Sequence, residues 1–189
     1  MGQGDGGNVI EELVTDHREV EELFGRIEAL PPGAEDRRLY ADRATMELVR
    51  HAMAEEDYLY PSVRERVPGG DVLADDELDR HARAERIMKD LEGREADDPE
   101  FDRLVGMLMR EVRTHLADEE RNLFPRVRAE CPTVILDGLG DKVRKARKTA
   151  PTRPHPSAPD EPPADKTLAP GVGLVDRMRD AMTGPGKPY

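Results

Sequence analysis

Four histidines and two glutamates recur in the sequence at a constant offset of 64 residues. The three pairs are His17 with His81, His51 with His115, and Glu55 with Glu119. In both halves 34 residues separate the two histidines, and the glutamate follows the second histidine by four residues. Imidazole and carboxylate groups are common ligands of metal ions. The spacing therefore indicates a duplicated set of metal ligands.

The residues around these ligands are also repeated. Residues 47–64 and 111–128 are identical at eight of eighteen aligned positions. Each copy of an internal repeat usually contributes half of a shared core or site. Because side chains four residues apart lie on one face of a helix, the second histidine and the glutamate of each copy can reach the same ion.

A histidine on an apolar helix face is more often a hydrogen-bonded core residue than a ligand. That alternative applies to any one of the four histidines, but six matching positions in two copies favour a metal site. A polar group buried without a partner costs about 1–3 kcal/mol, and an isolated charge costs far more. A dinuclear metal centre would remove this cost, and the mixture of imidazole and carboxylate ligands points to iron.

The elements that carry these residues are predicted to be helices. Apolar residues recur at helical spacing through the first 130 residues, and no strand pattern competes with them. Asn8 with Glu11 forms a capping box for the first helix, which ends before Pro31. Further helices should run from about 34 to the mid-60s and from about 72 to 92.

The fourth helix should begin with Asp98 as N-cap and Pro99 at its first position, and should end near Pro132. Pro61 is expected to kink the second helix near its end, because proline removes an intrahelical hydrogen bond. Short connections between four helices imply antiparallel neighbours. The fold class is therefore all-α, an up-down-up-down four-helix bundle with an additional C-terminal helix and a Pro-rich tail.

Three regions follow from this pattern. Residues 1–130 are expected to form the metal-binding bundle, and residues 131–149 an additional amphipathic helix. The basic run 142–148 is typical of a solvated helix end favoured by the helix dipole, with an anion-binding patch as the alternative. Residues 150–189 have the composition of a Pro-rich linker, with a short amphipathic segment at 171–182 that either docks on the bundle or binds a partner.

Charge and hydropathy exclude several classes of function. The net charge of −12 argues against nucleic acid as a partner, because phosphates would be repelled. A membrane span is not expected, because no long apolar run occurs. The Gly-rich residues 1–7 lack the apolar stretch of a secretory signal. We therefore expect a cytoplasmic protein.

The pattern His17, His51-Ala-Met-Ala-Glu55, His81, His115-Leu-Ala-Asp-Glu119 resembles the hemerythrin-like HHE cation-binding family. The resemblance covers residues 8–130 and includes all six positions of the pattern. It implies an oxo- or hydroxo-bridged pair of non-heme iron ions. In that arrangement His17 and His51 bind one iron, His81 and His115 bind the other, and Glu55 and Glu119 bridge them.

The sequence departs from the oxygen carriers of that family, which have five histidines on their irons where this chain offers four. Tyr58 is a candidate for the remaining position because it follows His51 by seven residues, although a core tyrosine is an equal alternative. Glu21 and Glu85 each follow a histidine by four residues and could be terminal ligands, acceptors for imidazole N–H groups or solvated surface residues.

Glu56 and Glu120 lie about 100° around the helix from the ligand row, so they are expected at the surface or behind the ligands. The resemblance implies a centre that reacts with oxygen, peroxide or NO. Having fewer histidines argues against a dedicated oxygen carrier. A catalase-like or NO-reducing activity, with peroxide or a diatomic molecule as partner, is therefore expected. The alternatives are an O₂ or NO carrier or sensor, and an iron-binding or storage protein.

Overall fold

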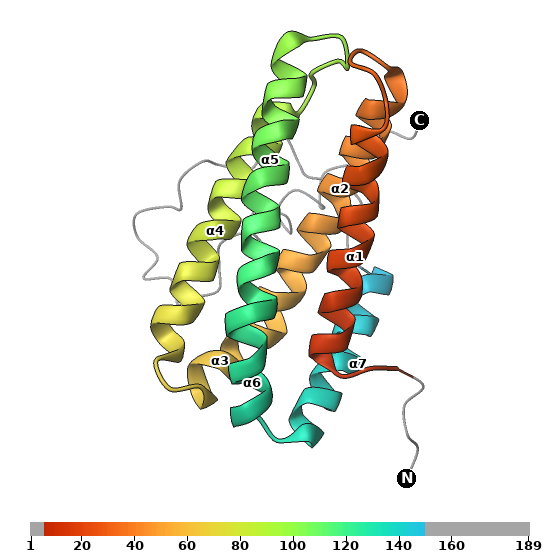
Figure 1. Cartoon of the computed structure of the whole chain (residues 1–189). Coiled ribbons are helices and arrows are strands. Elements are labelled where there is room, and N and C mark those ends of the chain that lie inside the picture. The colour runs from red at the N-terminus through yellow and green to blue at the C-terminus, as the bar shows by residue number, and fades with distance from the viewer. Residues whose placement is uncertain (1–5, 150–189) are drawn as a thin grey trace.

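A computed structural model describes residues 6–149, which form a bundle of four long antiparallel helices (Figure 1). The helices run alternately up and down and are α1 (Val9–Glu28), α2 (Glu35–Ala54), α4 (Gly70–Leu91) and α5 (Pro99–Asp118). α1 packs mainly against α2, and α4 packs against α5. The expected all-α bundle is therefore confirmed, with no strand within the described residues.

Two of the helices continue through a wide π-helical turn. α2 passes through η1 (Glu55–Leu59) into α3 (Tyr60–Arg66), and α5 passes through η2 (Glu119–Leu123) into α6 (Phe124–Glu130). A proline, Pro61 or Pro125, stands two residues after the end of each turn and has no N–H to donate. The preceding amide instead bonds five residues back, which inserts one residue into the helix.

The helix starts follow the capping signals in the sequence. The Asn8 side chain accepts from the Ile10 and Glu11 amides, and the Glu11 side chain accepts from the Asn8 amide. Asp98 Oδ1 accepts from the Glu100 amide at 2.9 Å and begins α5. These caps fix where α1 and α5 begin, and with them the height of their histidines in the bundle.

The interior consists of two apolar clusters separated by a polar layer. One cluster surrounds Phe24 and Phe101 in the half of the bundle that holds the loops after α1 and α4. The other surrounds Leu13, Leu59 and Leu123 in the half that holds α3 and α6. The four histidines of the repeat lie at the level between the two clusters, so hydrophobic packing on both sides holds them in place.

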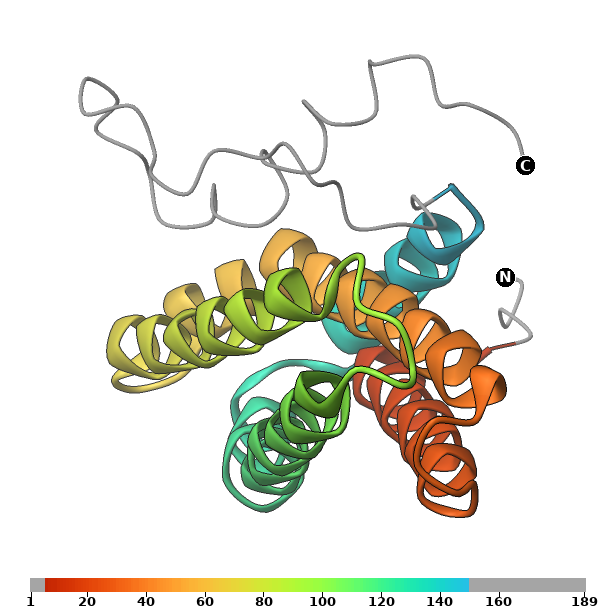
Figure 2. The ribbon, with the colours of Figure 1, turned by 90° about the horizontal axis from the view of Figure 1, so that it is seen from above.

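A fifth helix, α7 (Thr133–Thr149), covers the outside of α1 and α2 (Figure 2). It buries Leu136, Leu139 and Val143 in the second apolar cluster. Its basic end is not simply solvated as expected, because Arg144 and Arg147 form ion pairs with acidic residues of α1. The expectations for residues 150–189, including the segment at 171–182, concern a part of the chain outside the described residues.

None of the helices formed by residues 6–149 combines the length and the apolar character that crossing a membrane requires. The net charge of −12 reflects an excess of acidic over basic residues. Several arginines pair with acids of neighbouring helices, such as Arg64 with Asp75 and Arg83 with Glu111. Such exposed pairs contribute little individually. The apolar clusters and the polar layer between them therefore dominate the packing.

The contact between α3 and α4 yields a first prediction. A Cβ atom on Gly70 would lie 2.0 Å from the Val63 carbonyl oxygen, whereas one on Gly25 would meet nothing within 4 Å. Gly70→Ala should therefore lower the free energy of unfolding by roughly 1–3 kcal/mol through overpacking. Gly25→Ala should raise it by roughly 0.5–1 kcal/mol, because alanine favours a helix interior. Chemical denaturation would measure both, and equal effects would contradict the close approach of α3 to α4.

Candidate metal centre

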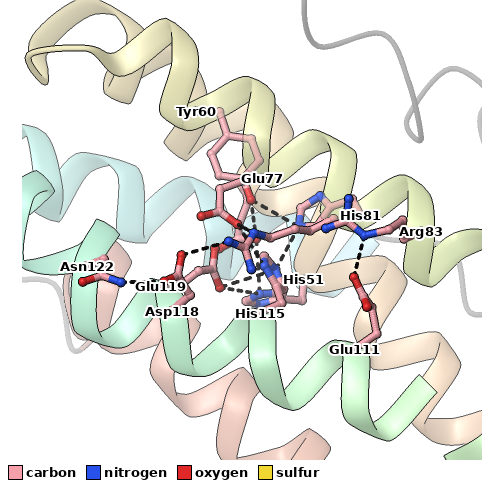
Figure 3. Close-up of polar contacts among 12 residues, drawn as sticks. His51, Tyr60, Glu77, His81, Arg83, Glu111, His115, Asp118, Glu119 and Asn122 are labelled. Carbon is pink, nitrogen blue, oxygen red and sulfur yellow. Dashed lines mark hydrogen bonds and ion pairs between the residues drawn. The ribbon is translucent and has the colours of Figure 1, made fainter. Parts of the chain in front are cut away.

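The polar layer brings together all six residues of the repeated ligand pattern. α1, α2, α4 and α5 each contribute one histidine, and the two glutamates stand at the first residue of the two π-helical turns. All six side chains are buried, and Glu55 and Glu119 are 0% exposed. Figure 3 shows how His51, His81, His115 and Glu119 converge.

The imidazole Nε2 atoms point inward at the two glutamates. Glu55 Oε2 lies 3.3 Å from His51 Nε2 and 3.2 Å from His81 Nε2. Glu119 Oε2 lies 3.4 Å from His17 Nε2, 3.8 Å from His51 Nε2 and 3.6 Å from His115 Nε2. Each glutamate therefore faces histidines of both copies, which is the placement that a bridging carboxylate needs.

The outer nitrogen of each histidine faces a second carboxylate. The four Nδ1 contacts are His17 with Glu120 at 2.8 Å, His51 with Asp16 at 3.5 Å, His81 with Glu56 at 2.9 Å and His115 with Glu77 at 3.0 Å. A carboxylate at Nδ1 favours the tautomer with its proton there, which leaves the Nε2 lone pair facing inward. The expectation that Glu56 and Glu120 stand behind the ligands agrees with these contacts.

The inward-facing atoms fit a bound cation. His81 Nε2 and His115 Nε2 are 3.2 Å apart, and with Nδ1 protonated on both rings two lone pairs face each other. Buried atoms without a hydrogen-bond partner include His17 Nε2, His51 Nε2, Glu55 Oε1 and both oxygens of Glu119. One atom each from His51, Glu55, His115 and Glu119 lies within 4.8 Å of the others. A positive ion among these atoms would satisfy them together.

The charges of the cluster also call for a cation. Burial lowers the pKa of His51, but the charges of Glu55 and Glu119 and the hydrogen bonds to them together outweigh burial and raise the pKa to about 10. His81 also has a pKa raised to about 10, because hydrogen bonds to Glu55 and Glu56 outweigh burial. Burial lowers the pKa of His115 to about 4. The carboxylates thus draw positive charge into the layer, as protons or as metal ions.

Tyr60 reaches this centre from η1–α3, whereas sequence spacing had favoured Tyr58. The Tyr60 hydroxyl lies 3.1 Å from Glu55 Oε2 and 3.2 Å from His81 Nε2 (Figure 3). Tyr58 instead packs against the second apolar cluster. The cause is the π-helical turn, in which the residue five positions after Glu55, rather than the one three positions after it, returns to the ligand row. Burial and nearby carboxylates raise the pKa of Tyr60 well above its usual value.

For the two other candidates from the sequence, Glu21 and Glu85, a different carboxylate stands behind the histidine. Glu21 pairs with Arg113 of α5 at 3.1 Å, and the carboxylate on His17 is Glu120 instead. Glu85 is half-buried on α4, and the carboxylate on His81 is Glu56. A long arginine side chain on the neighbouring helix thus turns Glu21 away from its own histidine.

Sequence reasoning missed three residues of the site, namely Tyr60, Asp16 and Glu77. Asp16 and Glu77 act across helices, on His51 and His115, so no spacing along one helix reveals them. Tyr60 left a signal that could have been used. It and its repeat mate Phe124 both stand directly before a proline, five residues after a ligand glutamate.

A small apolar pocket leads to the centre between α2, α4 and α5. His51, His81 and His115 form part of its wall, and Leu48, Ala52, Ala84, Met88 and Val112 supply apolar surface. Arg80 and Glu111 also line it. A small uncharged molecule could approach the inward-facing nitrogen atoms by this route.

Comparison with known proteins gives consistent results. The family model of the hemerythrin HHE cation-binding domain matches residues 8–127. A hemerythrin-like protein of Schizosaccharomyces pombe is 22% identical over 171 residues, covering 90% of this chain and 84% of its own length. The crystal structure of an HHE cation-binding domain-containing protein from Mycobacterium kansasii superposes with a TM-score of 0.66 at 21% identity. It covers 76% of this chain and 90% of the other.

Removal of bound metal provides the second prediction. A ligand that binds only the folded state adds about 2.7 kcal/mol at a concentration of 100 Kd. For a domain of this size, chelation should therefore lower the melting temperature by roughly 5–10 °C. Thermal unfolding with and without chelator would measure the shift, and His51→Ala/His115→Ala, which lacks two inner ligands, should show none. An unchanged melting temperature after verified metal removal would favour the alternative in which the four histidines are hydrogen-bonded core residues and bind no metal.

Proposed function

The chain belongs to the hemerythrin HHE cation-binding family, and from this premise we propose that its polar layer holds two iron ions that react with hydrogen peroxide. The observation that carries the proposal is the convergence of four imidazole Nε2 atoms on two fully buried carboxylates. A donor set of imidazole and carboxylate suits iron. The duplicated pattern offers two histidines for each ion.

His17 and His51 would hold one ion, and His81 and His115 the other. Glu55 and Glu119 would bridge them, since each faces histidines of both copies. Two iron ions would supply the reversible two-electron chemistry by which one peroxide is oxidised to O₂ and another is reduced to water. In balance, the first peroxide gives up two electrons and two protons, and the second takes them up to form two water molecules.

The protein's own groups would select the substrate and hold protons. The apolar wall around Leu48, Ala84 and Val112 favours a small uncharged molecule over an anion. The Tyr60 hydroxyl lies within hydrogen-bond distance of Glu55 and of His81. It could hold a proton beside the centre or offer its oxygen to the ion on His81. The outer carboxylates keep each imidazole oriented for its ion.

Four histidines rather than five favour this reaction over reversible oxygen carriage. Two oxygens must be accommodated when peroxide reacts at a metal pair, and an exchangeable position allows this without expelling a protein ligand. At the repeat position of Tyr60 stands Phe124, which stacks on His17 with ring centroids 5.6 Å apart and has no polar atom to offer. The two halves of the centre are therefore chemically unequal, with the oxygen donor beside His81.

The third prediction concerns stoichiometry and activity. Loaded protein should contain two irons per chain and evolve oxygen from hydrogen peroxide. Glu55→Gln and Glu119→Gln, which keep the side-chain volume but remove a bridging charge, should lose at least about tenfold in iron affinity. Oxygen evolution should fall with it. Metal analysis and an oxygen electrode would follow both quantities.

Glu21→Gln is the matched control, because Glu21 follows a histidine by the same four residues but pairs with Arg113. It should leave iron content and oxygen evolution unchanged. Iron-loaded wild type that binds oxygen reversibly and leaves peroxide untouched would replace the proposed reaction with the carrier or sensor function. One ion per fully loaded chain, or a strong preference for zinc, would remove the di-iron centre.

The fourth prediction separates the two tyrosines. If Tyr60 offers its oxygen to an iron, the oxidised protein should show a visible phenolate-to-iron absorption band. The band should disappear in Tyr60→Phe and persist in Tyr58→Phe, because Tyr58 packs in the apolar cluster. Absorption spectra of the three proteins at equal iron content would decide. Identical spectra would restrict Tyr60 to hydrogen bonding.

A further inference from the structure

α7 lies outside the residues 8–127 matched by the family model, yet one of its side chains reaches a carboxylate that stands behind a candidate metal ligand. Arg147 of α7 forms an ion pair with Asp16 Oδ1. The other oxygen of Asp16 faces His51 Nδ1 at 3.5 Å. A continuous line of charged and polar groups therefore runs from α7 through α1 to a candidate ligand on α2.

Asp16 needs a cationic partner because it is buried. Only 5% of the residue is exposed, and a buried carboxylate without a counter-charge is strongly unfavourable. Its repeat mate is Arg80, so the repeat itself supplies no second acid at this position. Asp16 is therefore a special feature of the first half, and Arg147 is the counter-charge provided for it.

Two of the three other outer carboxylates, Glu120 and Glu77, pair with arginines from within the bundle. Glu120, behind His17, pairs with Arg18 at 2.6 Å. Glu77, behind His115, pairs with Arg80 at 3.5 Å. At His51 this role falls to a residue of the added helix.

We infer that Arg147 is a positioning residue for the metal centre, which holds Asp16 so that His51 presents Nε2 to the ion. α7 thus contributes to the metal site in addition to packing against α1 and α2. This inference rests on the proposed metal binding and not on the peroxide reaction. Loss of a residue behind a ligand typically lowers metal affinity by roughly 10–100-fold.

Arg144 gives a matched control. It lies one turn earlier on α7, its side chain is 26% exposed against 25% for Arg147, and it also binds α1, through Glu12. Arg144→Met and Arg147→Met should therefore cost similar stability, but only Arg147→Met should alter the centre. Arg147→Lys keeps the charge and should recover part of the affinity.

The test is anaerobic titration of chelator-treated full-length protein with Fe²⁺, and in parallel with Co²⁺, whose visible spectrum reports its ligands. Arg147→Met should weaken one binding step about tenfold and change the Co²⁺ spectrum, whereas Arg144→Met should do neither. Asp16→Asn should resemble Arg147→Met in metal affinity, and the double variant should bind metal no more weakly than either single one, because both residues act on the centre through the contact between Asp16 and Arg147.

Equal affinities and spectra for Arg144→Met and Arg147→Met would overturn the inference, as would additive losses in the double variant. Wild type that binds Fe²⁺ tightly yet leaves peroxide untouched would remove the proposed reaction alone. The comparison between the arginine variants would then still decide the role of Arg147. Wild type that takes up neither metal would overturn both proposals.

Discussion

Two fully buried carboxylates, Glu55 and Glu119, impose the constraint on which the rest of the molecule depends. Negative charge in an apolar interior is tolerated only beside positive charge and hydrogen-bond donors. The bundle meets this demand with four imidazoles, one from each long helix, and with acids behind them that fix their orientation. The apolar clusters above and below exclude water, which strengthens every interaction in the layer. Burying these carboxylates without a cation would cost free energy, so the same arrangement is well suited to binding a cation.

The sequence repeat explains why the two halves of the centre are similar. Positions at which the repeat mates differ make the two halves chemically different. Glu56 and Glu120 are repeat mates and serve His81 and His17 in the same way. Tyr60 and Phe124 are also mates, but only one of them offers an oxygen atom. Behind His51 and His115 the repeat fails, and unrelated acids, Asp16 and Glu77, fill the same role. A repeated scaffold thus presents two chemically unequal halves of the candidate metal centre.

Much of this could be predicted from the sequence, because the features involved are local and periodic. The capping residues, the apolar stripes and the spacing of His51 and Glu55 each follow from helix geometry, and the bundle agreed with them. The features that the sequence did not reveal depend on other helices or on a break in the helical periodicity. Counting along a straight helix offered Tyr58 as a ligand or, equally, as a core residue, whereas the turn before Pro61 adds one residue and brings Tyr60 to the centre. Glu21 was left open as a ligand, an acceptor for an imidazole N–H group or a surface residue, and in the structure Arg113 of α5 binds it.

The π-helical turns matter for both the fold and the site. Each turn begins at a glutamate of the candidate centre and leads into a short helix that packs on the second apolar cluster. A proline two residues after each turn prevents an ordinary helical hydrogen bond, and the chain responds by widening at the ligand glutamate. The widening begins at Glu55 and at Glu119, at the level where the bundle must make room between its helices. Below it, α3 and α6 close over the second apolar cluster, and α7 completes that cluster while reaching Asp16. The polar layer is therefore shaped both by prolines within the repeat and by α7, a helix outside the repeat.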